Sequence, residues 1–299
     1  MRIFYCDHFS YPLPEGHRFP AAKYTMLRER VAREMGERCE MVVPERATDE
    51  QLLLAHDPLY LEKVFCGTLS IKEVRRIGLP WSPELVERCR RSVGSTLGAC
   101  RAALQDGLAV SLTGGTHHAF ADRGEGFCVF NDCAVAARVM QQESRAQRVL
   151  IIDCDAHQGN GTAAIMAGDP TVFTFSMHGA RNFPFHKEQS DIDVELPDGA
   201  TDALYLDLLD AALDRVLPAA RAGLAIYLAG ADAFAGDSLG RLGVSKAGLA
   251  ARDRLVFERC REAGMPVAVV MGGGYARRLD DTVDIQCATV SAALTYSVL

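Results

Sequence analysis

The feature that most constrains this chain is an acidic motif directly after an apolar strand. Residues 149–152 are a β-branched apolar run typical of a buried strand, and residues 153–157 then read Asp-x-Asp-x-His. In extended backbone Asp153, Asp155 and His157 point to one side, because side chains alternate with period two. Carboxylates beside an apolar strand are costly unless paired or bound to metal. The added imidazole favours a metal site over an acidic loop, with ligands suited to zinc or to iron, manganese or cobalt.

Strand-like and helix-like segments alternate along the rest of the chain. The expected strands are 2–6, 41–43, 108–112, 149–152, 172–175, 224–228 and 267–271. The expected helices are 21–35, 48–55, 58–65, 83–104, 131–143, a short one after Gly161, 203–217, 245–263 and 282–298. This alternation predicts an α/β fold with a parallel sheet covered on both faces. Since no linker, repeat or composition break interrupts it, we expect residues 1–299 to form a single domain.

Composition narrows the functional classes and the compartment. The formal net charge is −7 with no run of five like charges, which argues against nucleic acid as a partner. No apolar stretch reaches the ~18 residues of a membrane span. The ten cysteines include no Cys-x-x-Cys pair, and several lie in apolar segments, so we expect a reduced, cytoplasmic setting.

Three further polar clusters follow predicted strands. Gly-Gly-Thr-His-His ends at His118, Ala-Gly-Ala-Asp ends at Asp232, and Gly-Gly-Gly-Tyr ends at Tyr275. Because ligands of parallel α/β sheets bind beyond the carboxyl ends of the strands, these clusters should meet the Asp-x-Asp-x-His motif at one edge. His117 and His118 are then candidate acid/base groups, and Asp232 is a candidate third metal ligand. Tyr275 is a candidate hydrogen-bond donor to a polarised carbonyl.

Taken in order, these motifs resemble the zinc-dependent histone deacetylase family of the arginase/deacetylase superfamily. The motifs that carry the resemblance are Gly16-His17-Arg18-Phe19-Pro20, Gly115-Thr116-His117-His118, Gly126-Phe127-Cys128 with Asn131-Asp132, the run from Asp153 to Gly161, Gly230-Ala231-Asp232 with Gly236-Asp237, and Gly272-Gly273-Gly274-Tyr275. Residues 121–124 and 155–161 look most like class IV and bacterial-type members. The resemblance implies a three-layer α/β/α fold with a mainly parallel eight-stranded sheet. It also implies a metal-dependent amidohydrolase that cleaves N-acyl amides, typically acyl-lysine in a peptide or protein.

The resemblance also implies roles for individual residues. The residues that match the zinc ligands are Asp155, His157 and Asp232. Those that match catalytic groups are His118 as general base and acid, His117 as the second histidine, Asp153 as its orienter, Asn160 behind His118, and Tyr275 as the carbonyl-polarising phenol. Those that match the substrate channel are Gly126, Phe127, Phe183 and Gly273. Those that match a structural potassium site, largely through carbonyls, are Asp153, Asp155, His157, Ser176 and Met177.

Several functions remain open at the level of sequence. An acylpolyamine amidohydrolase, acting on an acylated small amine, shares all the catalytic residues. An arginase-like enzyme would need a second metal and would leave Tyr275 unexplained. A non-catalytic acyl-lysine binder would be expected to lack a metal ligand or Tyr275, and the sequence has both. The class IV resemblance implies tolerance of long acyl groups. Glycines at 114, 115 and 272–274 flank the site, where bulky side chains would otherwise close the acyl end, although the glycines could also serve only tight turns around an acetyl-sized pocket.

Overall fold

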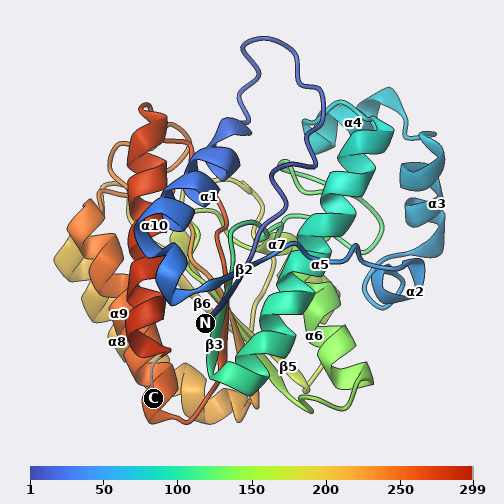
Figure 1. The fold of residues 1–299 in the computed structure, drawn as a ribbon. Helices are drawn as coiled ribbons and strands as arrows, with labels where there is room; N and C mark the ends of the chain where they lie inside the picture. The colour runs from blue at the N-terminus through green and yellow to red at the C-terminus, as the bar shows by residue number, and fades with distance from the viewer. Residues whose placement is uncertain (298–299) are drawn as a thin grey trace.

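Eight parallel strands form one sheet through the centre of the molecule (Figure 1). The computed structural model describes residues 1–297. The strands are β1 (Arg2–Phe4), β2 (Glu40–Val42), β3 (Leu108–Ser111), β4 (Val149–Asp153), β5 (Val172–Gly179), β6 (Ile192–Leu196), β7 (Leu224–Leu228) and β8 (Val267–Val270). Their spatial order is β2-β1-β3-β8-β7-β4-β5-β6, and every neighbouring pair is parallel. The predicted α/β fold with an eight-stranded sheet is therefore confirmed.

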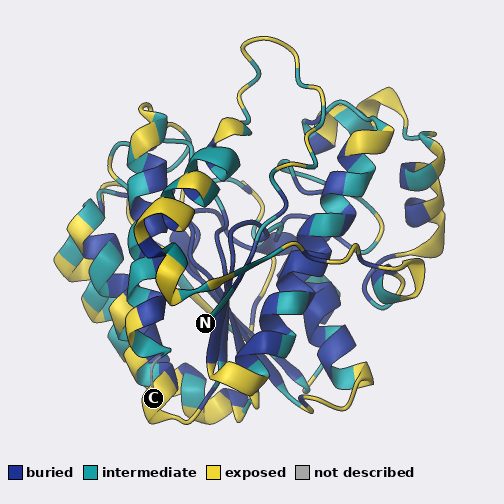
Figure 2. Ribbon diagram, in the orientation of Figure 1, coloured by how far each residue is buried: buried dark blue, intermediate teal, exposed yellow. Residues whose placement is uncertain are grey.

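Helices cover both faces of this sheet and enclose two apolar cores (Figures 1 and 2). One face carries α1 (Ala22–Met35), α8 (Asp202–Ala220), α9 (Lys246–Glu262) and α10 (Leu279–Tyr296). The other carries α2 (Asp49–Leu52), α3 (Pro58–Cys66), α4 (Ile71–Ile77), α5 (Pro83–Asp106), α6 (Asp132–Gln142) and α7 (Asn160–Met166). Strand residues alternate between the two cores, since Leu150 and Ile152 pack on the first and Val149 and Ile151 on the second. No helix within residues 1–297 is long and apolar enough to cross a membrane.

Local signals locate most helix starts but miss two short elements. Thr48 forms its predicted capping box, yet α2 ends at Leu52 and not at Ala55, because the chain turns there into the Asp57 cap of α3. The sequence predicts neither α4, which has seven residues, nor β6, an edge strand with mostly exposed or half-buried residues. The first helix is expected to end at Gly36, and in the structure a short 3-10 turn (Gly36–Arg38) follows α1 at that point. The predicted end of the last helix, Val298, lies outside the described residues.

The topology brings the predicted clusters to one edge. Strands β3, β8, β7 and β4 are consecutive neighbours in the sheet, and each delivers its following loop to the carboxyl end. In the register of β4 and β7, Asp153 pairs with Leu228, so the Asp-x-Asp-x-His motif and the loop to Asp232 leave the sheet at the same level. The fold thereby places the four loops around a common point.

Candidate metal centre and active site

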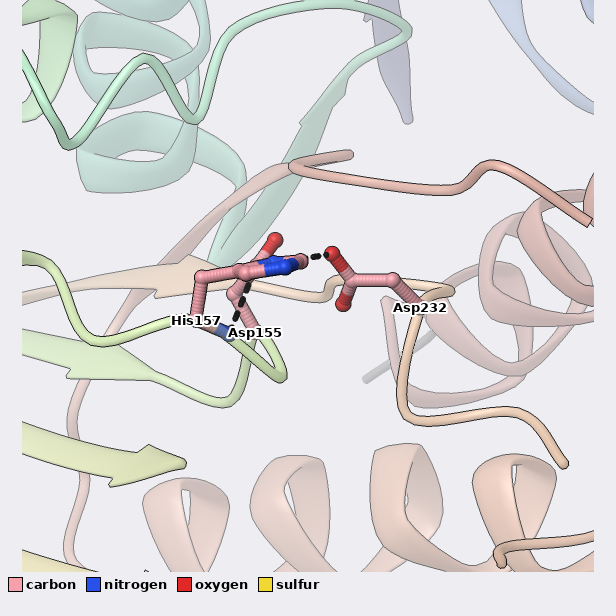
Figure 3. A group of neighbouring side chains, drawn as sticks. All are labelled: Asp155, His157 and Asp232. Carbon is pink, nitrogen blue, oxygen red and sulfur yellow. Dashed lines mark hydrogen bonds and ion pairs between the residues drawn. The ribbon is translucent and has the colours of Figure 1, made fainter. Parts of the chain in front are cut away.

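Two carboxylates and one imidazole converge where β4 and β7 end (Figure 3). One ligand atom from each of Asp155, His157 and Asp232 lies within 4.8 Å of the others, and all three residues are buried. His157 Nδ1 is 3.0 Å from Asp155 Oδ1 and 3.0 Å from Asp232 Oδ2. The structure thus brings together the three residues predicted as metal ligands.

The donor set fits a divalent cation. The second oxygen of each carboxylate is held by a backbone N–H: Gly273 N donates to Asp155 Oδ2 at 2.7 Å, and Ala156 N donates to Asp232 Oδ1 at 2.9 Å. One oxygen of each acid is therefore left facing His157. Burial and the neighbouring charge of Asp155 raise the pKa of Asp232 to about 7. A cation at this point would relieve that repulsion, and two oxygens with one nitrogen suit zinc with a position left for water or substrate.

Two adjacent histidines face this centre with different partners. His117 Nδ1 lies 2.6 Å from Asp153 Oδ2, and because a carboxylate only accepts, Nδ1 carries the hydrogen. His118 Nδ1 lies 2.7 Å from Asn160 Oδ1, so it also donates and leaves Nε2 free to accept a proton. The ring of His118 lies 6.0 Å, centroid to centroid, from that of His157.

The partners separate the two histidines electrostatically. Burial lowers the pKa of His117, but the charges of Asp153 and Asp155 outweigh it and raise that pKa to about 9. For His118, burial and the neighbouring His117 and His157 hold the pKa well below its usual value, against a smaller opposing effect of Asn160. His117 is thus suited to stay charged, and His118 is suited to accept a proton.

Two phenylalanines and a tyrosine form the approach to the triad. Phe127, Phe183 and Tyr275 all line the opening above the site, with His118 and His157 at its base. The Phe183 ring is 5.0 Å from the His118 ring, edge to face, and the Phe127 ring is 6.0 Å from that of Tyr275. Burial raises the pKa of Tyr275 well above its usual value, so the phenol keeps its hydrogen and can donate it.

Two glycines allow these groups to approach one another. A Cβ at Gly273 would lie 2.0 Å from Asp232 Oδ2, and a Cβ at Gly126, where φ is +55°, would lie 2.6 Å from His118 Cδ2. Both were predicted as channel residues, and their contacts show that they also make room for a metal-ligand carboxylate and for an active-site histidine.

Two buried charged residues hold the loops in place: Asp132, which belongs to a motif of the family resemblance but was given no role, and Arg252, which was not predicted. Asp132 accepts hydrogen bonds from Thr96 Oγ1, from Thr116 Oγ1 and from the backbone N–H groups of Gly115 and Thr116. Arg252 donates to the carbonyl of Gly230 at 2.6 Å, two residues before Asp232. These contacts fix the segments that carry the histidine pair and the third ligand.

Two further charged groups support the loop that carries Tyr275. Asp237 accepts from the backbone N–H of Tyr275 at 2.6 Å. Lys23, 1% exposed, donates to the carbonyl of Gly274 at 3.3 Å, and its ammonium lies 5.1 Å from the centre of the Tyr275 ring. Burial lowers the pKa of Lys23 to about 8, opposed by Asp232 and Asp155. Asp237 and Lys23 therefore both hold the glycine-rich turn, through hydrogen bonds to its backbone.

The residues predicted for potassium are also neighbours. Asp153 pairs with Ser176 in the register of β4 and β5, Met177 follows, and Asp155 and His157 continue the same strand end. All five are buried. A potassium ion at this point stays a prediction.

Comparisons with known proteins show which family and fold this chain resembles. A family model described as the histone deacetylase domain matches residues 17–290. An uncharacterized protein of Picosynechococcus is 45% identical over 94% of both chains. Histone deacetylase 2 of Arabidopsis thaliana is 34% identical over 82% of this chain, which spans 66% of that relative's length. The crystal structure of the HDA15 HD domain aligns with a TM-score of 0.82 at 20% identity, covering 100% of this chain and 93% of that one, and so shows the fold.

Asp232→Ala should abolish tight binding of a divalent cation. It removes one of three ligands, so the loss should exceed the roughly 10–100-fold that partners outside the ligand set contribute. Elemental analysis and a metal titration of the purified variant measure this, with circular dichroism to check folding. Glu125→Gln, at the opening and away from the triad, is the control and should retain the parental stoichiometry. Full occupancy in Asp232→Ala would show that the ligands lie elsewhere.

Proposed function

Because the chain belongs to the histone deacetylase family, we propose that it hydrolyses N-acyl amides, with acyl-lysine in a peptide or protein as substrate. The observation that supports this most is the buried Asp155, His157 and Asp232 triad with His118 beside it. Phe127 and Phe183 both line the opening that leads to the triad and offer apolar contacts to an aliphatic side chain. We also propose that the whole chain acts as one catalytic domain, since the site loops follow the four central strands of a single eight-stranded sheet.

The proposed metal is one divalent ion per chain, with zinc favoured by the donor set. Asp155, His157 and Asp232 would hold it. A cation bound there supplies Lewis acidity, which lowers the pKa of a water molecule and polarises the acyl oxygen.

The chain's own groups account for the proton transfers. His118 Nε2 takes the proton of the attacking water, since Nδ1 is already committed to Asn160. The same nitrogen later gives that proton to the departing amine. His117, held by Asp153, keeps its positive charge and stabilises the negative charge that develops nearby. Burial with the neighbouring histidines keeps the pKa of His118 low, and because Asn160 is neutral, its hydrogen bond raises that pKa only slightly.

Tyr275 has the place and protonation state of an oxyanion donor. Tyr275 lines both the opening and the space around the triad. The backbone bond from Tyr275 N to Asp237 and the contact of Lys23 with Gly274 restrict the ring's position. A donor positioned before reaction stabilises the transition state without reorganisation.

The competing substrate is an acylated polyamine, which would use the same catalytic groups. A non-catalytic acyl-lysine binder is less well supported, because all three candidate ligands and Tyr275 are assembled around one space. Substrate assays therefore decide between peptide and free amine.

His118→Ala should lower kcat more than His117→Ala. His118 carries the proton, a role typically worth 10²–10⁴-fold in rate, whereas His117 acts through its charge. Single-turnover rates with one acyl-lysine peptide measure both variants, with metal content checked in each. Equal losses, or a greater loss in His117→Ala, would contradict this division of roles.

The proposed acyl preference rests on the class IV resemblance and on a small apolar cavity beside the triad, and not on the glycines. Added Cβ atoms at Gly115 and Gly272 would meet protein at 2.5 and 2.4 Å, so these glycines permit close packing and leave no room for substrate. A small cavity of about 40 Å³, lined by apolar groups such as Leu79 and Leu85, adjoins the space around the triad and shares Phe19, Tyr24, Thr116 and Phe127 with it.

A matched series from acetyl- to myristoyl-lysine peptides tests both the activity and this preference. Each methylene that reaches apolar surface can gain about 0.8 kcal/mol, so medium or long acyl groups should give higher kcat/KM than acetyl. The same acyl groups on a polyamine form the parallel arm and should react more slowly. A steady fall from acetyl onwards would refute the long-chain preference, and faster turnover of the polyamines would reassign the substrate.

A further inference from the structure

Four arginines stand around the opening that leads to the triad. Arg18 lies in the loop between β1 and α1, Arg76 in the last turn of α4, Arg181 two residues after the end of β5, and Arg241 in the loop between β7 and α9. Their positions are far apart in the sequence, so the fold gathers them from four separate segments. All four are exposed.

Most of this positive charge is not neutralised by the protein. Within residues 1–297, Arg18 and Arg76 have no carboxylate within ion-pairing distance. Arg181 and Arg241 share a single acid, Asp198, at 3.9 and 3.3 Å. Among the described residues that line the opening, Glu125 is the one carboxylate. The rim therefore carries excess positive charge that is available to a ligand.

The rim is positively charged, whereas the chain as a whole carries a negative net charge. The formal net charge is −7, so a random patch of surface would be acidic. Charge of one sign gathered at a cleft focuses the field there and attracts ligands of the opposite sign. It also repels cations, and this includes a polyamine or a lysine-rich peptide on its way to the triad.

We propose that the rim formed by Arg18, Arg76, Arg181 and Arg241 binds an acidic polypeptide segment whose Asp and Glu residues flank the acyl-lysine. This rests on the proposed deacylase function and names its substrate class. The charge of the rim supports an acidic polypeptide over a small cationic amine, because the four guanidinium groups attract carboxylates and repel cations at the opening. Phe185, 81% exposed at the same rim, offers an apolar contact for a peptide chain.

The arginines suit carboxylates in particular. A guanidinium presents a planar fork of donors that matches a carboxylate, and its long stem lets it adapt to a mobile peptide. Because these side chains are exposed, each contributes modestly alone, and their joint effect appears mainly in the association rate and its salt dependence. The preference should therefore be strongest at low ionic strength.

The test compares three peptides that share one acyl-lysine and differ only in flanking residues: acidic, neutral or basic. Both kcat/KM and binding by fluorescence anisotropy are measured for each peptide at low salt and at higher salt. We expect the acidic peptide to exceed the basic one by about tenfold or more at low salt in both measurements. That ratio should shrink as salt screens the charges, since the Debye length falls to about 10 Å at 0.1 M.

A charge-reversed variant links the preference to the rim. In Arg18→Glu/Arg76→Glu the ratio of acidic to basic peptide should fall to about one or invert. The matched control is Arg215→Glu/Arg254→Glu, which changes the net charge equally on the exposed faces of α8 and α9, and it should keep the parental ratio. Thermal melting checks that both variants are folded.

The outcomes separate this inference from the proposed function. Similar kcat/KM and affinity for the three peptides, or a preference for the basic one, would overturn the inference while leaving the deacylase intact. Failure to hydrolyse any peptide would overturn the proposed function, and the anisotropy ratios would then still decide whether the rim binds acidic chains. A preference that survives in Arg18→Glu/Arg76→Glu would place acidic recognition elsewhere and also overturn the inference.

Discussion

The mutual repulsion of two buried carboxylates is the constraint on which the rest of this structure depends. Asp155 and Asp232 leave adjacent strands at the same level and meet at one imidazole nitrogen, out of reach of bulk water. Such a pair is unfavourable unless a cation or donors compensate it. The surrounding chain supplies two backbone N–H groups and places the Lys23 ammonium nearby, yet one oxygen of each acid still faces its neighbour. The proposed metal ion would offset the repulsion that remains between these two carboxylates.

The two adjacent histidines, His117 and His118, have different hydrogen-bond partners, and the proposed proton transfer depends on this difference. Asp153 gives His117 a negative neighbour, and Asn160 gives His118 a neutral one. One imidazole is thereby held charged and the other neutral, although both sit in the same turn. The loop keeps this geometry because Asp132 holds the backbone just before it. Loss of the Asp132 hydrogen bonds would therefore displace His118 through the backbone, without a direct change at the His118 side chain.

Local patterns were enough to predict the fold and to select the residues that the structure gathers at the triad. The Asp-x-Asp-x-His motif follows one apolar strand, and glycine-rich turns follow three others. These motifs mark the places where polar side chains lie at the carboxyl edge of the sheet. The roles of Lys23 and Arg252 were missed because their contacts with the site loops go to backbone carbonyls distant in sequence, those of Gly274 and Gly230. A signal for Lys23 existed: it lies in one helical stripe with Leu27 and Val31, and a charge within an apolar stripe needs a buried partner. The arginine rim could not be predicted, because four unrelated loops meet only in the folded chain.

The most direct test of the account is turnover of an acyl-lysine peptide as metal is returned to chelated protein. The three-ligand site predicts that activity rises in proportion to added zinc and reaches its plateau at one equivalent per chain. Activity unchanged by chelation, or a plateau only at two equivalents, would contradict a single metal held by Asp155, His157 and Asp232.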